Sequence, residues 1–137
     1  MRNNVQSNEH RTLKKITVYR VENANWEGLY SSIRSVNLFN RDRHPAPMSD
    51  EGLKEQNAFL VPGELGGPTP ESYYYGFGSF DQLRRWMPVG IMKYLEKDGY
   101  YVQVIEAEGF IGKTQAVFTK NPETTVRKEI INLTDLI

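Results

Sequence analysis

The sequence predicts a single α+β domain with a mainly antiparallel sheet, a short helix pair and a long Pro/Gly-rich loop. Three observations predict this fold. Segments of alternating β-branched and aromatic residues recur before and after the middle of the chain, which is typical of strands. A helical pattern with clear start and stop signals lies between them. The 137 residues, 39% of them hydrophobic, suit one domain with its own core.

The N-terminal part is expected to be a tail followed by a strand. Residues 1–13 are polar and predict a flexible tail, so that residues 14–137 form the domain. The segment "KKITVYRVE" (residues 14–22) predicts a fairly central strand, with Arg20 on the face of its even-numbered residues and Tyr19 on the other. The following "NANWEGLYSS" predicts a turn at Gly28.

The middle of the chain predicts a loop, a short strand and two helices. Residues 40–72 hold five prolines and four glycines, and residues 40–70 are expected to be mostly irregular and to cover a cleft as a lid. Within them, "SDEGLKEQN" predicts a short helix capped by Ser49 or Asp50. The stretch "SYYYGFG" (residues 72–78) predicts a strand that runs into a helix capped by Ser79 and ended by Pro88. A second helix is expected at about residues 90–97.

Three strands are expected in the C-terminal part. They are "YYVQVIEAE" (residues 100–108), "TQAVFT" (residues 114–119) and "TVRKEIINL" (residues 125–133), with turns at "GFIGK" and at "NP". The order of strand, long loop, strand, helix pair and three strands favours an antiparallel sheet.

Composition excludes several classes of function. Lysine plus arginine equals aspartate plus glutamate at 17 each, so no nucleic-acid partner is expected. The absence of cysteine excludes disulfides, zinc–thiolate sites and cysteine nucleophiles, and the two histidines lack ligand spacing, so no metal site is expected. No apolar run approaches the ~18 residues of a membrane helix, and no signal peptide is seen, so we expect a cytoplasmic protein.

Arg20 and the aromatic run before Ser79 are the candidates for a site. A cation on a rigid apolar strand is suited to gripping a phosphate or a carboxylate. The alternative is a surface arginine, or one paired with Glu106 or Glu108. Aromatic residues in this pattern belong to the core or the sheet face more often than to a ligand site, although tyrosine favours places where one end of the ring is wet.

Five stretches carry a resemblance to a known group. The segments "VYRVE…GLY", "HPAPMSDEG", "YGFGSFDQLRRWM", "YYVQVIEAE" and "GKTQAVF" resemble a group of short, uncharacterised proteins encoded in bacteriophage genomes, over about residues 16–118. More distantly, the layout is similar to small ADP-ribosyltransferase-like domains. That second resemblance implies that Arg20 holds the phosphates of NAD and that Ser79 stands at a strand-to-helix corner. Gln115 falls where those domains carry a catalytic glutamate, and a glutamine cannot act as a carboxylate.

These considerations define an expected site and its alternatives. Arg20 and Gln115 are expected in catalytic positions, and the expected ligand-binding residues are Tyr19, His44, Asp50, Tyr75, Phe77 and Ser79. No cofactor is expected, but NAD or a related nucleotide is expected as substrate or ligand, in a phage protein that counters or redirects a host system. One alternative is a phage protein that binds and inhibits a host defence protein without chemistry of its own. The other is a virion assembly or structural protein.

Overall fold

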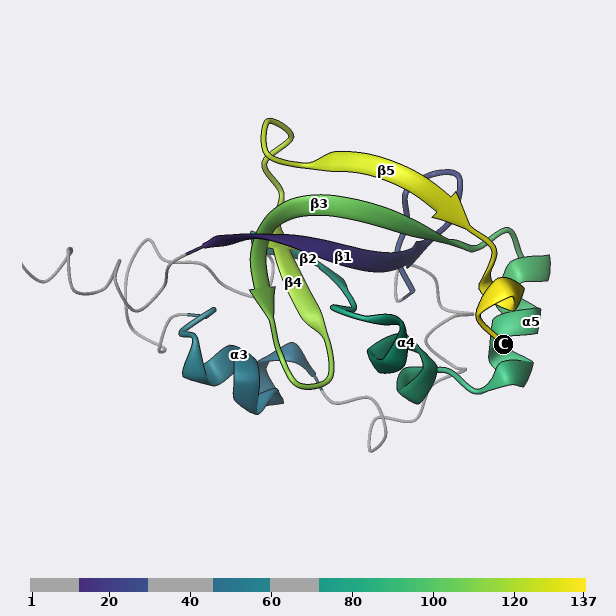
Figure 1. The fold of residues 1–137 in the computed structure, drawn as a ribbon, viewed down its shortest axis with the longest axis horizontal. Helices are drawn as coiled ribbons and strands as arrows, with labels where there is room; N and C mark the ends of the chain where they lie inside the picture. The colour runs from purple at the N-terminus through teal and green to yellow at the C-terminus, as the bar shows by residue number, and fades with distance from the viewer. Residues whose placement is uncertain (1–12, 30–45, 60–71) are drawn as a thin grey trace, which may run out of the picture.

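The structure, a computed structural model, describes residues 13–29, 46–59 and 72–137. Figure 1 shows an antiparallel sheet above the helices α3 and α4, with α5 and the C-terminus at one end of the molecule. The fold is therefore α+β, as the sequence predicted. The elements are β1 (Lys14–Glu22), η1 (Pro47–Ser49), α3 (Glu51–Glu55), β2 (Tyr73–Gly76), α4 (Phe80–Trp86), α5 (Val89–Lys97), β3 (Tyr101–Ile111), β4 (Ala116–Thr119), β5 (Val126–Ile131) and η3 (Leu133–Leu136).

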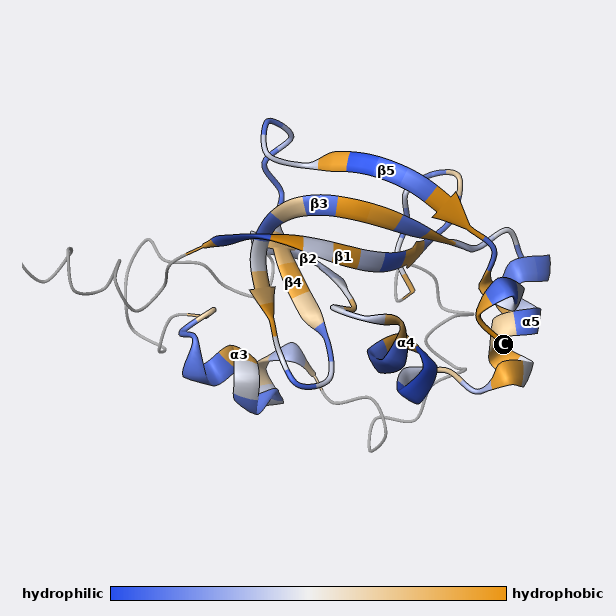
Figure 2. Ribbon diagram, viewed as in Figure 1, coloured by the Kyte–Doolittle hydropathy of each residue, from blue (hydrophilic) through white to orange (hydrophobic). Residues whose placement is uncertain are grey.

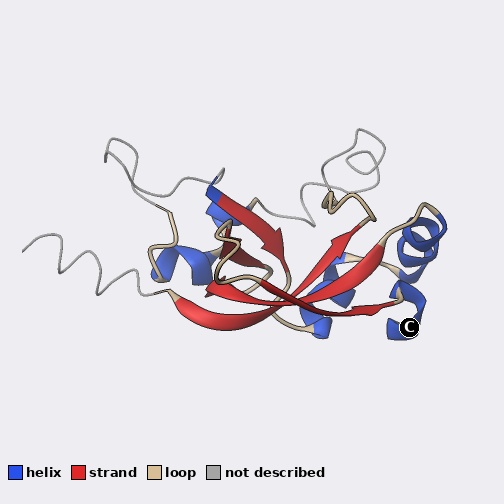
Figure 3. Cartoon of the chain, turned by 90° about the horizontal axis from the view of Figure 1, so that it is seen from above, coloured by secondary structure: helices blue, strands red, loops and turns tan. Residues whose placement is uncertain are grey.

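The sheet curls until its two ends meet. Its strands are ordered β1-β3-β4-β2, and β5 pairs with the first half of β3, all antiparallel. Just beyond β2, Phe77 exchanges two backbone hydrogen bonds with Tyr19 of β1, at 2.8 and 2.9 Å. This bridge joins the last strand of the order back to the first. Figure 3 shows the resulting strong twist of the strands.

Gly109 allows β3 to bend where the sequence predicted a turn. The predicted strand ended at residue 108, but β3 continues to Ile111 and pairs there with β4. A Cβ atom on Gly109 would lie 2.0 Å from the carbonyl oxygen of Val117, so only glycine permits this approach. The turn predicted within residues 109–113 therefore comes only after Ile111, because Gly109 serves a close strand contact and does not break the strand.

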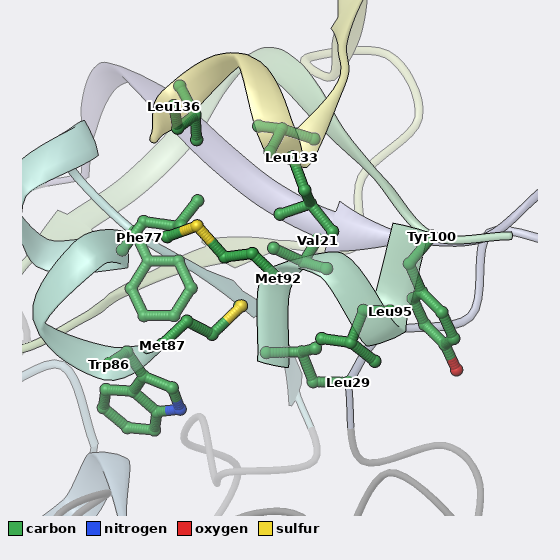
Figure 4. Close-up of a cluster of buried hydrophobic side chains, with 12 residues drawn as sticks. Val21, Leu29, Phe77, Trp86, Met87, Met92, Leu95, Tyr100, Leu133 and Leu136 are labelled. Atoms are coloured by element: carbon green, nitrogen blue, oxygen red, sulfur yellow. The ribbon is translucent and has the colours of Figure 1, made fainter. Parts of the chain in front are cut away.

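The helices cover one face of the sheet and bury the larger part of the core. Figure 4 shows this cluster between α4, α5, η3 and the strands. It consists of Val21, Leu29, Phe77, Leu83, Trp86, Met87, Met92, Leu95, Tyr100, Val102, Leu133 and Leu136. Figure 2 shows hydrophobic residues along β3 and β4, whereas the visible sides of α3 and α4 are largely hydrophilic. The last predicted strand ends at Ile131, because the leucines of η3 turn back into this core.

The predicted start of α4 is confirmed. Ser79 is the N-cap, and its hydroxyl accepts a hydrogen bond from the Gln82 backbone amide at 3.1 Å. The Gln82 side chain then accepts from the Gly78 amide at 2.7 Å and donates to the Gly112 carbonyl at 2.8 Å. Gln82 therefore ties the helix start to the β3–β4 turn.

Asp50 joins the short helix α3 to the β3–β4 turn. Its buried carboxylate caps α3 by accepting from the Leu53 amide at 3.0 Å. It also accepts from the Lys113 amide at 3.0 Å and from the amide and hydroxyl of Thr114 at 2.8 and 2.7 Å. Burial alone would raise the pKa of Asp50, but these four hydrogen bonds outweigh it and hold the pKa below its usual 3.8.

Part of the sequence-based description lies outside the described residues. These are the predicted tail, apart from Leu13, and most of the predicted lid at residues 40–70. The described piece of that lid, residues 46–59, contributes Leu53 and Ala58 to a second buried cluster with Tyr73, Phe110 and Val117. In the described ranges, no helix is long and apolar enough to cross a membrane.

Candidate functional site

Arg20 is buried and bound on two sides. Only 8% of the residue is exposed. Its Nε donates to Glu22 Oε1 at 3.2 Å and its Nη1 donates to the Tyr75 carbonyl at 2.8 Å. The carboxylate partner is Glu22, so the alternative pairing with Glu106 or Glu108 was wrong. The bond to Tyr75 spans the gap that opens between β1 and β2 beyond the Tyr19–Phe77 bridge.

A pocket of about 310 Å³ occupies this gap, and we call it the Arg20 pocket. Its walls are mostly apolar and aromatic, with a few polar groups, which is typical of small-molecule sites. They are formed by Arg20, Val21, Gly28, Leu29, Tyr73, Tyr74, Tyr75, Gly76, Phe77, Trp86, Gln115 and Lys120. The structure thus brings four of the predicted site residues, Arg20, Tyr75, Phe77 and Gln115, to one pocket.

The third nitrogen of the Arg20 guanidinium, Nη2, lies beside Gly28, which also lines this pocket. Nη2 forms no hydrogen bond with any residue that the structure describes. A Cβ atom on Gly28 would lie 2.8 Å from Nη2, so any side chain at residue 28 would collide with the guanidinium. Burial lowers the pKa of Arg20, while the charge of Glu22 opposes that effect, and an arginine remains charged under such a shift.

Glu22 holds two arginines from opposite sides. The residue is completely buried, and its second oxygen, Oε2, accepts from Nη1 of Arg127 on β5. A fully buried carboxylate requires such partners. Burial raises the pKa of the neighbouring Tyr101, and the charge of Glu22 adds to that effect; the Tyr101 hydroxyl donates to the Asn23 carbonyl at 3.0 Å.

A second cavity of about 410 Å³ adjoins the first and shares Arg20, Tyr74 and Lys120 with it. We call it the Trp26 cleft, and it is lined by Arg20, Trp26, Tyr74, Lys120, Pro122, Thr125 and Arg127. Each of its cations lies over an aromatic ring. Arg20 and Lys120 each lie 5.0 Å from the centre of the Tyr74 ring, and Arg127 lies 4.1 Å from that of Trp26.

The charges around the cleft do not cancel. Three cations line it and, among its lining residues, there is no carboxylate. Glu22, which does not line the cleft, neutralises one of these charges through its ion pairs with Arg20 and Arg127. The three cations and Glu22 together therefore have a net charge of +2. The arrangement can therefore bind an anion, and the two aromatic rings, 61% and 43% exposed at Trp26 and Tyr74, can stack on a flat group.

The remaining predicted site residues lie elsewhere. Tyr19 packs against Phe80 with ring centres 4.3 Å apart, on the helix side of β1, and is not part of either cavity wall. Asp50 holds the β3–β4 turn instead of pointing into the cleft, because four donors surround it. Ser79 is a helix cap, and its turn already satisfies the Gly78 and Gln82 amides. His44 lies outside the described residues.

Sequence reasoning missed the residues that complete the Trp26 cleft. Trp26 and Arg127 are about 100 residues apart in the chain, and Lys120 belongs to a surface turn. One signal was available: a tryptophan in the polar stretch "NANWEG" has no hydrophobic neighbours to share a core with. The structure shows this Trp26 with a positive φ of 63°, which is rare for a bulky side chain.

The described ranges contain no group of three or more histidine, cysteine, aspartate or glutamate side chains that could hold a metal ion. Fold and site together define a small α+β domain with an arginine-centred pocket that opens beside a cationic, aromatic cleft. The chain matches the sequence profile of the Bacteriophage T4 Y00F protein family over residues 13–132, and it belongs to that family. Neither the comparison with curated proteins nor that with solved structures gives a significant match.

The family match confirms the resemblance to short phage proteins. No comparison shows the more distant likeness to ADP-ribosyltransferase-like domains, which stays a prediction.

Proposed function

We propose that this phage protein binds a phosphorylated nucleotide, of the class of NAD, ADP-ribose or ADP, with the base in the Arg20 pocket and a phosphate at Arg20. The single observation that carries the proposal is a buried, charged guanidinium beside a largely apolar pocket, with an Nη2 that has no hydrogen-bond partner among the described residues. A base needs apolar and aromatic walls, and a phosphate needs a rigid fork of donors.

Pocket size and composition support this assignment. Cavities of ~300–1,000 Å³ hold small ligands, and the Arg20 pocket lies within that range at about 310 Å³. Phe77 and Trp86, with ring centres 5.4 Å apart, supply aromatic wall, and Gln115 adds a polar group to the lining. An amide cannot act as a carboxylate base, so we propose binding and not transfer chemistry as the role of this site.

Gly28→Ala provides the sharpest test. The added Cβ would meet the Arg20 guanidinium, at 2.8 Å from Nη2 and 3.1 Å from Cζ, and would therefore block the phosphate position. Calorimetry should show binding of ADP, ADP-ribose or NAD to the wild type, and an affinity at least about tenfold lower for this variant. The matched control is Gly90→Ala, where a Cβ meets no atom within 4 Å, and its affinity should equal that of the wild type.

Arg20→Lys tests the role of the fork. A point charge replaces a planar pair of donors, so the affinity should fall about ten- to hundredfold even if the protein remains folded by circular dichroism. If the wild type binds none of these nucleotides at millimolar concentration, the proposal is wrong.

A second candidate function is the binding of a host protein. The observation that favours it is the exposure of Trp26 and Tyr74 next to Arg127, because Trp, Tyr and Arg are the residue types that dominate protein interfaces. Failure of nucleotide binding, together with an unchanged fold, would favour this candidate. Capture of an acidic host protein by the wild type, but not by Trp26→Ala, would support it.

A further inference from the structure

We propose that the Trp26 cleft is a polyphosphate subsite, so that the ligand class is the nucleoside di- and triphosphates. This inference rests on the proposed function, which places the base in the Arg20 pocket. It goes further by assigning the Trp26 cleft to the phosphates beyond the first. The shared wall of Arg20, Tyr74 and Lys120 gives a phosphate chain a path from the Arg20 pocket into the cleft.

Arg127 is held in place before any ligand arrives. Its Nη1 is bound to Glu22, and its guanidinium lies over the Trp26 ring at 4.1 Å. No other hydrogen bond joins this guanidinium to a residue in the described ranges, which leaves its remaining N–H groups for a ligand. A guanidinium with a fixed plane loses little entropy when it binds a phosphate, and its donors match two phosphate oxygens.

The backbone of Trp26 supports this view of Arg127. A tryptophan at φ 63° is strained, and such strain persists where the surroundings hold it. The loop does so through Asn23, whose side-chain oxygen accepts from the amides of Asn25 and Glu27 at 2.9 and 3.1 Å. Asn23 also accepts from the Trp26 amide at 2.9 Å through its backbone carbonyl. The tight loop thereby presents the indole to Arg127, and we assign Trp26 as its positioning residue.

Lys120 is the second cation of the subsite. Its Nζ lies 5.0 Å from the centre of the Tyr74 ring and has no carboxylate partner among the described residues. An ammonium placed over a ring keeps its donors available, and it stands between the two cavities, since it lines both. Two cations beyond Arg20 suit a chain of two further phosphates.

A series of nucleotides with one, two and three phosphates tests the inference. The affinities of AMP, ADP and ATP for the wild type, measured by calorimetry at low salt without divalent cations, should rise by about tenfold for each added phosphate. Lys120→Met should remove most of this gain, because it takes one of the two cations beyond Arg20 out of the cleft. The matched control is Lys128→Met, which removes the same charge from β5 outside the cleft. This variant should keep the full gain in affinity from AMP to ATP.

The outcomes separate this inference from the proposed function. Equal affinities for AMP, ADP and ATP would overturn the polyphosphate subsite while leaving nucleotide binding in place. The polyphosphate subsite would also be wrong if a dinucleotide bound more tightly than ADP while ATP did not. That result would assign the cleft to a second base. Inorganic tripolyphosphate tests the cleft without a base: binding that Lys120→Met weakens and Lys128→Met does not would support the subsite even if no nucleotide bound.

Discussion

Arg20 and Glu22 lie two residues apart on the same face of β1, and their side chains form a buried ion pair, with Nε and Oε1 3.2 Å apart. Alternate residues of a strand share a face, so this spacing brings the two side chains together without a turn. Arg127, from the other side of β3, completes the group. One carboxylate therefore fixes both arginines that face the proposed ligand.

Replacing Glu22 with glutamine should destabilise the protein strongly. The change leaves two arginines without their shared counter-ion, and breaking a buried pair costs about 3–5 kcal/mol. The free energy of unfolding in urea measures this loss. Glu106→Gln is the control, because the Glu106–Lys128 pair is partly exposed and 3.9 Å long and should contribute less than ~1 kcal/mol. Similar losses of unfolding free energy in both variants would show that Glu22 does not stabilise the protein through the two arginines.

Gly109→Ala should be among the most damaging single changes. The new Cβ would overlap the Val117 carbonyl oxygen, so β3 or β4 must move, at a cost of roughly 2 kcal/mol or more. Gly90→Ala, in the exposed first turn of α5, should instead raise stability by about 0.4–1 kcal/mol, because alanine restricts the unfolded chain. Thermal denaturation of both variants checks the pair. A neutral Gly109→Ala would contradict the close approach of the strands.

Asp50 should make stability depend on pH in the acid range. Its folded pKa lies below its usual 3.8, so its contribution is complete above that pH and is lost as the pH falls through the folded value. Asp50→Asn should be less stable than the wild type by about 2 kcal/mol at pH 7, with a smaller difference at pH 3. Urea denaturation at both pH values checks this. The exposed Asp81 gives the control: Asp81→Asn should change neither value much.

Trp26→Gly should separate stability from binding. Glycine adopts a positive φ without strain, and the lost indole is mostly exposed, so stability should stay within about 1 kcal/mol of the wild type or rise. Phosphate-dependent affinity should fall, because Arg127 loses the ring that orients it. Chemical denaturation and calorimetry on the same preparation measure the two effects. Unchanged ATP affinity would remove Trp26 from the site.

Ser79→Ala should cost about 1 kcal/mol by removing the cap of α4. Chemical denaturation measures the loss. Nucleotide affinity should not change, because Ser79 does not line either cavity. A fall in affinity without a loss of stability would restore the serine to the ligand site that the sequence suggested.

Local signals in the sequence determined the fold class and most of the elements. The alternation of hydrophobic residues predicted β1 and the C-terminal strands. Ser79 and Pro88 marked the two ends of α4, and Asp50 marked the start of α3. Each of these signals depends on neighbours within a few residues. Arg20 was also recognisable, as a cation in an apolar strand. The expectation that Arg20 shares a site with Tyr75, Phe77 and Gln115 came with the resemblance to ADP-ribosyltransferase-like domains. The structure places all four residues at one pocket.

Only the tertiary structure decided which side chains complete the site. Glu22, Trp26, Lys120 and Arg127 are polar or exposed residues in ordinary surroundings, and no local pattern links the first two to the last two. The pairing of β1 and β5 on either side of β3 brings Arg127 to Glu22, and the curl of the sheet brings Tyr74 to Arg20. Gly109 shows the same limit: its role in β3 follows from the close approach of Val117 on β4, which its own neighbours in the sequence do not indicate. Contacts between residues about 100 positions apart depend on sheet register and curvature, which no short stretch of sequence specifies.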